Sequence, residues 1–338
     1  MKKIKYIIML FTFFVLNLFI FNVNANTNSE IPFSISPIKT NNQLTKNAGY
    51  IDVVNTPNAN QNVKVMVSNN SDKTQKFIVD ASDATTSDGV SVDYIPKNQK
   101  LISNNTFSKT ILNKDHQKKL LLRAHSSDIV TFNLKFPSHK FDGIIMGGIS
   151  VYQDSNNQHS NNGQGLSINN KFVYSIAVLL RNNAKNNVIP NLSAGNVFQT
   201  TVNYRPVVKT VLTNDKNNFI RGLSTNTVIK DSDGKTVTTN NTTLGQVAPI
   251  SEFHLVTPLS NKLTAGTYTL YGHAKDADNH SWSWVRKFDI TGSNEEETEQ
   301  NTLNNDNSFN PIYIIIIIIL IIIIIFILYR YKKYKNRH

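Results

Sequence analysis

Cysteine is absent from this 338-residue chain. Its absence excludes disulfide scaffolds, zinc sites with cysteine ligands, iron–sulfur clusters and catalysis by a thiol. Glycine and proline are also scarce, at 14 and 10 residues, so the chain is neither collagen-like nor a proline-rich stalk. We expect no cofactor and no metal site.

Acidic residues are missing from both ends of the chain, where basic residues gather. The chain carries 35 Lys and Arg against 23 Asp and Glu, a formal net charge of +12. Three lysines lie within the first five residues and five basic residues lie after residue 329, which leaves 27 basic against 23 acidic residues between them. The excess charge therefore belongs to the ends, and nucleic-acid binding loses its main support.

Residues 1–25 have the three parts of a secretory signal peptide. Basic residues come first, an apolar stretch runs from Ile7 to Phe21, and Val23-Asn24-Ala25 has the small-x-small pattern of a cleavage site. The alternative is an uncleaved N-terminal anchor helix. With cleavage, the mature chain begins near Asn26.

Residues 312–329 contain no charged side chain and are mostly isoleucine. A helix of this length spans ~27 Å, close to the ~30 Å core of a lipid bilayer. The basic residues after it predict a cytoplasmic tail at 330–338, with the bulk of the chain outside the cell. A sortase substrate would need a Leu-Pro-x-Thr-Gly-like motif upstream, and 304–311 has none, so we expect this single membrane helix to be retained.

Between residues 32 and 291 the apolar pattern has a period of two, as in β-strands. Val63, Val65 and Val67 alternate with polar residues, and turn signals such as Asp88-Gly89 punctuate the strand-like runs. Many short strands with frequent turns predict an all-β fold with two immunoglobulin-like β-sandwiches in tandem. Thr264 to Leu270 resembles a tyrosine corner, in which Tyr268 bonds back to the main chain and Leu270 enters the core.

Composition divides this region further. We expect a first sandwich at 32–153, a polar linker at 154–170 and a second sandwich at 171–291. Residues 292–311 are rich in Glu and Asn, and they predict a flexible stalk above the membrane.

Catalytic motifs are largely absent. The chain contains neither Gly-x-Ser-x-Gly nor His-Glu-x-x-His. Ser36 and Lys39 match the Ser-x-x-Lys pattern of penicillin-binding enzymes but lack its companion motifs, so we interpret the match as chance. His273 to His280 offers oxygen and imidazole groups, but its spacing fits no standard metal site, and a polar hairpin turn is the better interpretation.

Trp282 and Trp284 stand two residues apart and therefore share one face of a predicted strand. They belong either to the sandwich core or to a contact surface for a sugar or a protein. Arg286 lies on the same face, which requires either a bulge or partial exposure of that face.

The segment from Phe141 to Ile149 is unusual because Gly147 and Gly148 are paired inside a predicted strand. Glycines there weaken a strand and often mark a bulge, an edge or the close approach of a ligand or another backbone.

The order of these parts resembles the WxL-interacting proteins of low-GC Gram-positive bacteria. In the first domain the resemblance rests on a series of short motifs: Phe33-Ser34-Ile35-Ser36-Pro37, Asn42-Gln43, Gly49-Tyr50-Ile51-Asp52, Val67-Ser68-Asn69, Asp88-Gly89 before Tyr94, and Phe141-Asp142-Gly143 before Gly147-Gly148-Ile149. In the second domain it rests on Val247-Ala248-Pro249-Ile250-Ser251, Ala265-Gly266-Thr267-Tyr268 and the Trp282/Trp284 strand. Ile250 is a departure, since the family usually has Asn at that place.

The resemblance implies a non-enzymatic cell-surface adhesion or scaffold protein with two binding domains. The first would bind peptidoglycan, and the second would bind a protein, either a WxL-domain surface protein or a host extracellular-matrix protein. The candidate wall-contact residues are Asn42, Gln43, Tyr50, Phe141, Asp142, Gly147 and Gly148. The candidate protein-contact residues are Trp282 and Trp284. The alternative is a secreted cell-wall-modifying glycoside hydrolase that uses dispersed carboxylates, since sequence spacing does not exclude such a pair.

Overall fold

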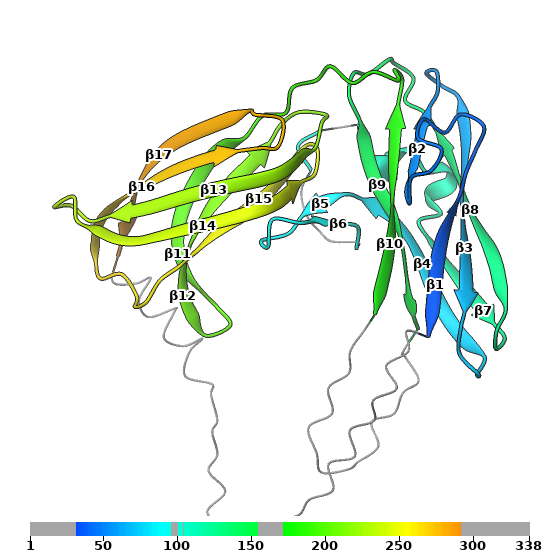
Figure 1. Cartoon of the computed structure of the whole chain (residues 1–338), viewed down its shortest axis with the longest axis horizontal. Helices are drawn as coiled ribbons and strands as arrows, with labels where there is room; N and C mark the ends of the chain where they lie inside the picture. Colours follow the sequence, from blue (N-terminus) through cyan, green and yellow to red (C-terminus); the bar gives the residue numbers. More distant parts are fainter. Residues whose placement is uncertain (1–31, 96–100, 104, 155–171, 292–338) are drawn as a thin grey trace, which may run out of the picture. The chain divides into compact units, whose positions relative to one another are not determined.

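The computed structural model of the chain describes residues 32–95, 101–103, 105–154 and 172–291. The expected signal peptide, stalk, membrane helix and tail lie outside these residues, as does nearly all of the expected linker. Within the described residues, no helix is long and apolar enough to cross a membrane. The described chain forms two compact units, each a pair of packed β-sheets (Figure 1).

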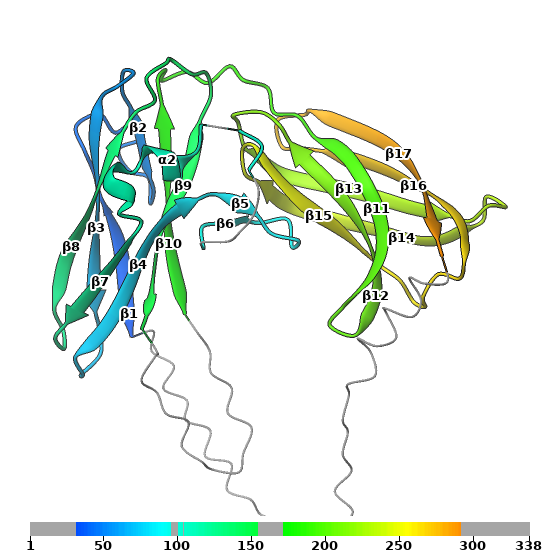
Figure 2. The same cartoon turned by 180° about the vertical axis from the view of Figure 1, so that it is seen from behind.

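Unit 1 contains residues 32–84, 94–95, 103, 105–154 and 172–188. A three-stranded sheet in the order β1-β3-β8 packs against a five-stranded sheet in the order β2-β10-β9-β4-β7. The strands are β1 Phe33–Ile38, β2 Ile51–Val54, β3 Asn60–Asn69, β4 Gln75–Asp83, β7 Gln117–Leu122, β8 Ser127–Lys135, β9 Ile145–Gln153 and β10 Val173–Arg181. Two short helical segments, α2 Phe107–Thr110 and η1 Leu112–Lys114, precede β7. Figure 2 shows α2 beside strands β4 and β9.

The alternation seen in the sequence builds the core of unit 1. Val63, Val65 and Val67 of β3 are fully buried, while the residues between them face outward. Phe33 packs against Phe77 from the opposite sheet, with ring centroids 5.3 Å apart. Burying each such side chain contributes roughly 1.5–3 kcal/mol, so the two-residue period itself drives the sandwich together.

Strand β10 follows the expected linker, yet it belongs to unit 1. We expected the second sandwich to begin at residue 171, whereas β10 pairs antiparallel with β9 and parallel with the four-residue strand β2. Ile176, Val178 and Leu180 of β10 join the core of unit 1. The physical reason is that β10 covers one side of β9 and provides the pairing partner for β2.

Unit 2 contains residues 85–93, 101–102 and 189–291. A three-stranded sheet in the order β11-β12-β15 packs against a four-stranded sheet in the order β14-β13-β16-β17. The strands are β11 Ser193–Val202, β12 Arg205–Asn214, β13 Ile220–Lys230, β14 Thr236–Val247, β15 Ser251–Pro258, β16 Gly266–Lys275 and β17 Ser281–Ile290. The prediction of two immunoglobulin-like sandwiches is confirmed.

The tyrosine corner in unit 2 is also confirmed. The Tyr268 hydroxyl donates a hydrogen bond to the main-chain oxygen of Thr264 at 3.0 Å, and its ring stacks on Phe288. Leu270 is fully buried in the core. The corner fixes the turn that leads into β16 and so sets the register of β16 against β17.

A small hairpin from an unexpected part of the chain completes unit 2. Strands β5 Thr85–Thr86 and β6 Val92–Asp93 pair with each other, and the turn between them carries Val90. Val90 is buried in the core of unit 2, and its main-chain oxygen accepts a hydrogen bond from the Gln246 amide at 2.8 Å. This segment, called the 85–93 hairpin below, lies between two strands of unit 1 in the sequence but packs as part of unit 2.

Gly272 leaves room for an aromatic ring inside unit 2. It lies opposite Trp284 in the β16–β17 pair, and a Cβ added to it would meet Cε2 of Trp284 at 2.1 Å. Gly272→Ala should therefore displace the indole and destabilise unit 2 by about 1–3 kcal/mol, as overpacked cores usually are. Both tryptophans of the chain lie on β17, so their fluorescence during urea unfolding measures this effect.

Gly195→Ala is the matched control for this substitution. A Cβ at Gly195 would meet Val211 at an ordinary contact distance of 3.5 Å. The control should leave the urea midpoint close to that of the unsubstituted chain. Equal midpoints for both variants would contradict the packing role of Gly272.

Candidate binding sites

Asn42 and Gln43 hold the loop before β2 against that strand. The Asn42 side-chain amide donates to the main-chain oxygen of Val54 at 3.0 Å and to the Gln61 side chain at 2.8 Å. The Gln43 side chain is buried, and its oxygen accepts the Asp52 amide at 3.1 Å. Both side chains are thus engaged inside unit 1, where they position the loop.

Tyr50 ends the same loop and is half-buried. Its main-chain oxygen accepts hydrogen bonds from the Lys39 ammonium at 2.7 Å and from the Gln43 amide at 3.2 Å. Lys39 also donates to the main-chain oxygen of Ala48, and burial lowers the pKa of this lysine. Lys39 therefore braces the loop from inside. Both of these hydrogen bonds of the Lys39 ammonium thus go to main-chain oxygens of the loop.

Phe141 and Asp142 lie in the turn before β9, at the same end of unit 1. Phe141 is buried, and its amide donates to the side-chain oxygen of Asn182 at 2.9 Å. The Asn182 amide in turn donates to the main-chain oxygen of Asn55 at 2.7 Å, directly after β2. The structure thus links Asn42 to Phe141 through Val54, Asn55 and Asn182 after the end of β2, whereas Tyr50 lies at the start of β2, on the loop that runs along this strand. We call this loop, together with the turn before β9, the β2 end; Tyr50 and the exposed Asp142 contribute side-chain surface there.

A buried ion pair fixes the strands behind the β2 end. Arg181 of β10 donates to Asp52 of β2 through Nε at 2.7 Å and through a terminal nitrogen at 3.1 Å. Only 2% of the Asp52 side chain and 11% of the Arg181 side chain are exposed. The two-point contact between a planar guanidinium and a carboxylate holds the short strand β2 in register with β10.

Gly147 and Gly148 make room for rings of the chain's own residues. A Cβ at Gly147 would meet the Phe107 ring at 2.1 Å, and a Cβ at Gly148 would meet the Tyr94 ring at 2.4 Å. Strand β9 lies in the middle of its sheet and pairs with both neighbours without a register shift. The expectation of a bulge or edge is therefore wrong, and aromatic side chains, rather than another backbone, make the close approach to these glycines.

The packing role of Tyr94 is one that sequence reasoning missed. Its ring covers Gly148, and its main-chain oxygen accepts hydrogen bonds from the Ser82 and Ser150 hydroxyls. Burial raises its pKa to about 12. No local pattern announces this contact, because Tyr94 and Ser150 are 56 residues apart in the sequence.

Trp284 belongs to the core of unit 2, with 7% of its surface exposed, and Trp282 is partly buried against the same core. Arg286 shares their face, as expected, but β16 and β17 pair without a bulge. Its guanidinium instead reaches the edge of the sandwich and donates to the main-chain oxygen of Ala194. The partial exposure of this face is confirmed, and the two indoles point toward the interior.

The opposite face of the same sheet presents side chains that the sequence analysis did not single out. Tyr271 lies next to Val285 on one side and Val228 on the other, by the strand register. Tyr271 and Val285 are 43% and 53% exposed. Their alternation with buried residues of β16 and β17 was the signal that could have placed them outside the core.

The segment from His273 to His280 forms the expected polar hairpin turn. One Asp276 oxygen accepts the amides of Asp278 and His280, and the other lies 2.8 Å from Nδ1 of His280. Asp278 pairs with Arg221. Among the described residues there is no group of three or more side chains that could hold a metal ion.

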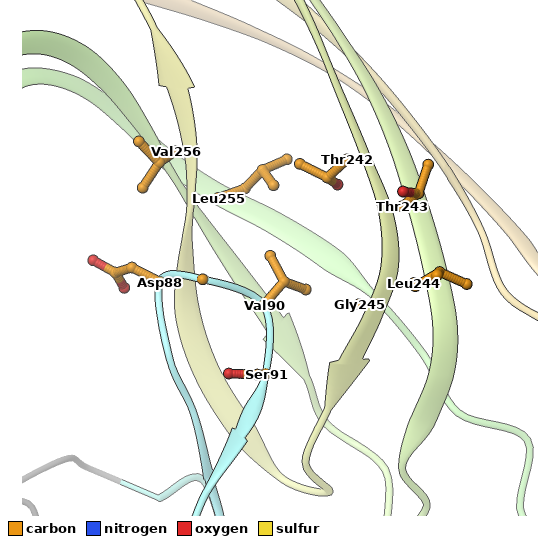
Figure 3. Close-up of a pocket in the computed structure, with 10 residues that line it drawn as sticks. Asp88, Val90, Ser91, Thr242, Thr243, Leu244, Gly245, Leu255 and Val256 are labelled. Carbon is orange, nitrogen blue, oxygen red and sulfur yellow. The ribbon is translucent and has the colours of Figure 1, made fainter. Parts of the chain in front are cut away.

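The 85–93 hairpin forms a polar site within unit 2 around Asp88. Asp88 accepts hydrogen bonds from the Lys209 ammonium at 2.7 Å and the His254 amide at 3.2 Å. Burial alone would raise the pKa of Asp88, but hydrogen bonds with the Lys209 ammonium and with Nδ1 of the His254 side chain outweigh it and hold the pKa below its ordinary value. Figure 3 shows Val90 between the ribbons that carry Leu255 and Gly245. These residues line a cavity of about 230 Å³.

Two family models match successive parts of the chain. The peptidoglycan binding domain of the WxL Interacting Protein matches residues 33–153. The host binding domain of the WxL Interacting Protein matches residues 163–301. Together these matches cover well over half of the 338 residues. The chain belongs to the WxL-interacting protein family.

The order of the two matches in this WxL-interacting protein confirms the order that the sequence resemblance implied. The matches support binding of peptidoglycan and of a host or protein partner at the cell surface. Both models describe binding domains, and they give no support to a glycoside hydrolase.

Solved structures similar to this WxL-interacting protein include three chaperones. The class 5 fimbriae chaperone CfaA is 12% identical, with a TM-score of 0.29, and the match covers 77% of this chain and 100% of CfaA. The E. coli chaperone DraB is 13% identical, with a TM-score of 0.27, and the match covers 77% of this chain and 95% of DraB. The YadV chaperone is 10% identical, with a TM-score of 0.26, and the match covers 76% of this chain and 100% of YadV. A search of curated proteins found no match.

Proposed function

We propose that this WxL-interacting protein is a non-enzymatic adhesion or scaffold protein, anchored in the cell membrane with both sandwiches outside. Its first domain would bind peptidoglycan, and its second would bind a WxL-domain surface protein or a host extracellular-matrix protein. The observation that carries the proposal is the ordered pair of family matches. The uncharged residues 312–329 and the basic tail after them support the anchor and its orientation.

Within the first domain, we place the peptidoglycan contact at the β2 end. Tyr50 offers an aromatic ring and Asp142 an exposed carboxylate, and both are side-chain types suited to the sugars and amines of a glycopeptide. Asn42, Gln43 and Phe141 would act by positioning these two residues, since their own polar groups are engaged within unit 1. Gly147 and Gly148 would act by packing.

Sedimentation with purified peptidoglycan tests this proposal. A soluble chain of residues 26–292 should sediment, and the double substitution Tyr50→Ala with Asp142→Ala should weaken binding about tenfold or more. The expected loss corresponds to one charged hydrogen bond and one ring contact, at about 1.5–3 kcal/mol for the former. The fraction bound across a range of peptidoglycan concentrations gives the measurement.

Asp72→Ala is the matched control, since it also removes an exposed carboxylate from unit 1. Asp72 lies in the loop after β3, at the opposite end from the β2 end. The control should bind as the unsubstituted chain does. Equal loss in both variants would remove the β2 end as the contact, and no sedimentation of the unsubstituted chain would overturn peptidoglycan binding itself.

A further inference from the structure

The outer face of the four-stranded sheet in unit 2 differs from an ordinary solvated sheet surface. Across three neighbouring strands, Val285, Tyr271 and Val228 lie directly opposite one another and form an apolar row. Val285 and Tyr271 are the most exposed members of this row, with Val228 half-buried beside them. We call this row and the residues around it the β16 face.

A contact within unit 2 restricts the side chain of Tyr271. The Lys230 ammonium lies 5.6 Å from the centre of its ring, within the range of a cation–π contact. An aromatic side chain that is already constrained loses little conformational entropy on binding, which makes it suited to anchor an interface.

Positive charge surrounds the apolar row. By the alternation of their strands, Lys230, Lys275 and Lys287 share the β16 face. Asp289 is also on this face, and one of its oxygens accepts a hydrogen bond from Thr267 at 2.6 Å. Three ammonium groups against one engaged carboxylate give a basic rim, which is complementary to an acidic surface.

We propose that the β16 face is the surface with which unit 2 binds its protein partner, and that the partner presents an apolar patch rimmed by carboxylates. The proposal rests on the proposed function, because it names the place and the chemistry of the protein contact. A polyanion would satisfy the lysines but gains little from the apolar row, so the combination favours a protein. The face lies opposite to the one into which Trp282 and Trp284 point.

Binding to two immobilised probes tests the proposal: a purified WxL-domain protein and a purified host matrix protein. The soluble chain of residues 26–292 should bind one of them. Tyr271→Ala should raise the dissociation constant at least tenfold, mainly through faster dissociation. Lys287→Glu should slow association, and the effect should shrink as salt is added.

Matched controls come from the rest of unit 2. Tyr204→Ala removes a tyrosine that is 62% exposed in the turn between β11 and β12, and Lys216→Glu reverses a charge in the loop after β12. Both should bind as the unsubstituted chain does. Tryptophan fluorescence during unfolding checks that each variant folds, since both indoles report on the inner side of β17.

Each outcome decides a different claim. Weaker binding by Tyr271→Ala and Lys287→Glu, with unchanged binding by the two controls, supports the β16 face as the binding surface. Unchanged binding by Tyr271→Ala and Lys287→Glu overturns the surface and leaves the proposed function standing. If soluble polyglutamate abolishes binding and Tyr271→Ala has no effect on it, the β16 face is a general polyanion surface, and the proposed protein contact is overturned. Failure of the unsubstituted chain to bind either probe overturns the surface together with protein binding by unit 2.

Discussion

Asp52→Ala should lower the free energy of unfolding of unit 1 by about 3–5 kcal/mol, because it breaks a buried ion pair. The substitution leaves the Arg181 guanidinium largely out of water and without its carboxylate partner. Whole domains are stable by only about 5–15 kcal/mol, so the loss is a large part of the total. Scanning calorimetry of residues 26–292 should show the transition of unit 1 moving to lower temperature.

Two comparison variants separate the burial of charge from the loss of a salt bridge. Asp72→Ala removes an exposed ion pair with His125, in which 94% of the Asp72 side chain and 65% of the His125 side chain are accessible. This substitution should change the free energy of unfolding by less than about 1 kcal/mol. The double substitution Asp52→Asn with Arg181→Met should cost less than Asp52→Ala alone, because it leaves no buried charge. Equal losses for Asp52→Ala and Asp72→Ala would contradict the role assigned to the buried pair.

The parts of the fold that local patterns control were predictable from the sequence. The alternation at Val63, Val65 and Val67 places every second residue in the core, because successive side chains of a strand point to opposite faces. The tyrosine corner at Tyr268 depends on a turn four residues upstream, within reach of a short motif. Fold class and family follow from such signals.

Contacts between distant segments escaped the sequence analysis. Arg181 and Asp52 are 129 residues apart, and their ion pair joins β10 to β2 beside the main-chain pairing of these strands. Gly147 and Gly148 attract attention in the sequence, but only the structure shows that Phe107 and Tyr94 fill the space above them. Spacing along the chain contains no information about which ring will cover which glycine.

The candidate protein contact illustrates a second limit. Trp282 and Trp284 are the rarest side chains of the chain, yet rarity does not tell which face of a strand is buried. The answer depends on which face of the sheet packs against β11, β12 and β15, and that is a property of the whole sandwich. Once the face is known, the exposed Tyr271 and Val285 follow from the same alternation.

The 85–93 hairpin leads to the second large expected effect. Thr86 is buried, and its hydroxyl accepts the Ala248 amide at 3.0 Å and lies 2.6 Å from the Ser251 hydroxyl. Val90 fills the core beside Gly245, where an added Cβ would meet it at 2.6 Å. The double substitution Thr86→Ala with Val90→Ala leaves one buried amide without its partner and removes three buried methyl groups, one from Thr86 and two from Val90. It should destabilise unit 2 by about 2–5 kcal/mol.

Tryptophan fluorescence isolates this effect, since both indoles lie on β17 of unit 2 and neither lies in unit 1. Urea unfolding of residues 26–292 should give a lower midpoint for the double variant. Val237→Ala with Thr239→Ala, which removes the same two side-chain types from exposed positions on β14, should leave the midpoint nearly unchanged.

A chain of residues 163–301 alone lacks the hairpin and should lose at least as much stability as the double variant. If that shorter chain instead unfolds at the midpoint of the longer one, the hairpin contributes nothing to unit 2. The packing of the hairpin against unit 2 in the longer chain would then need an explanation other than stability.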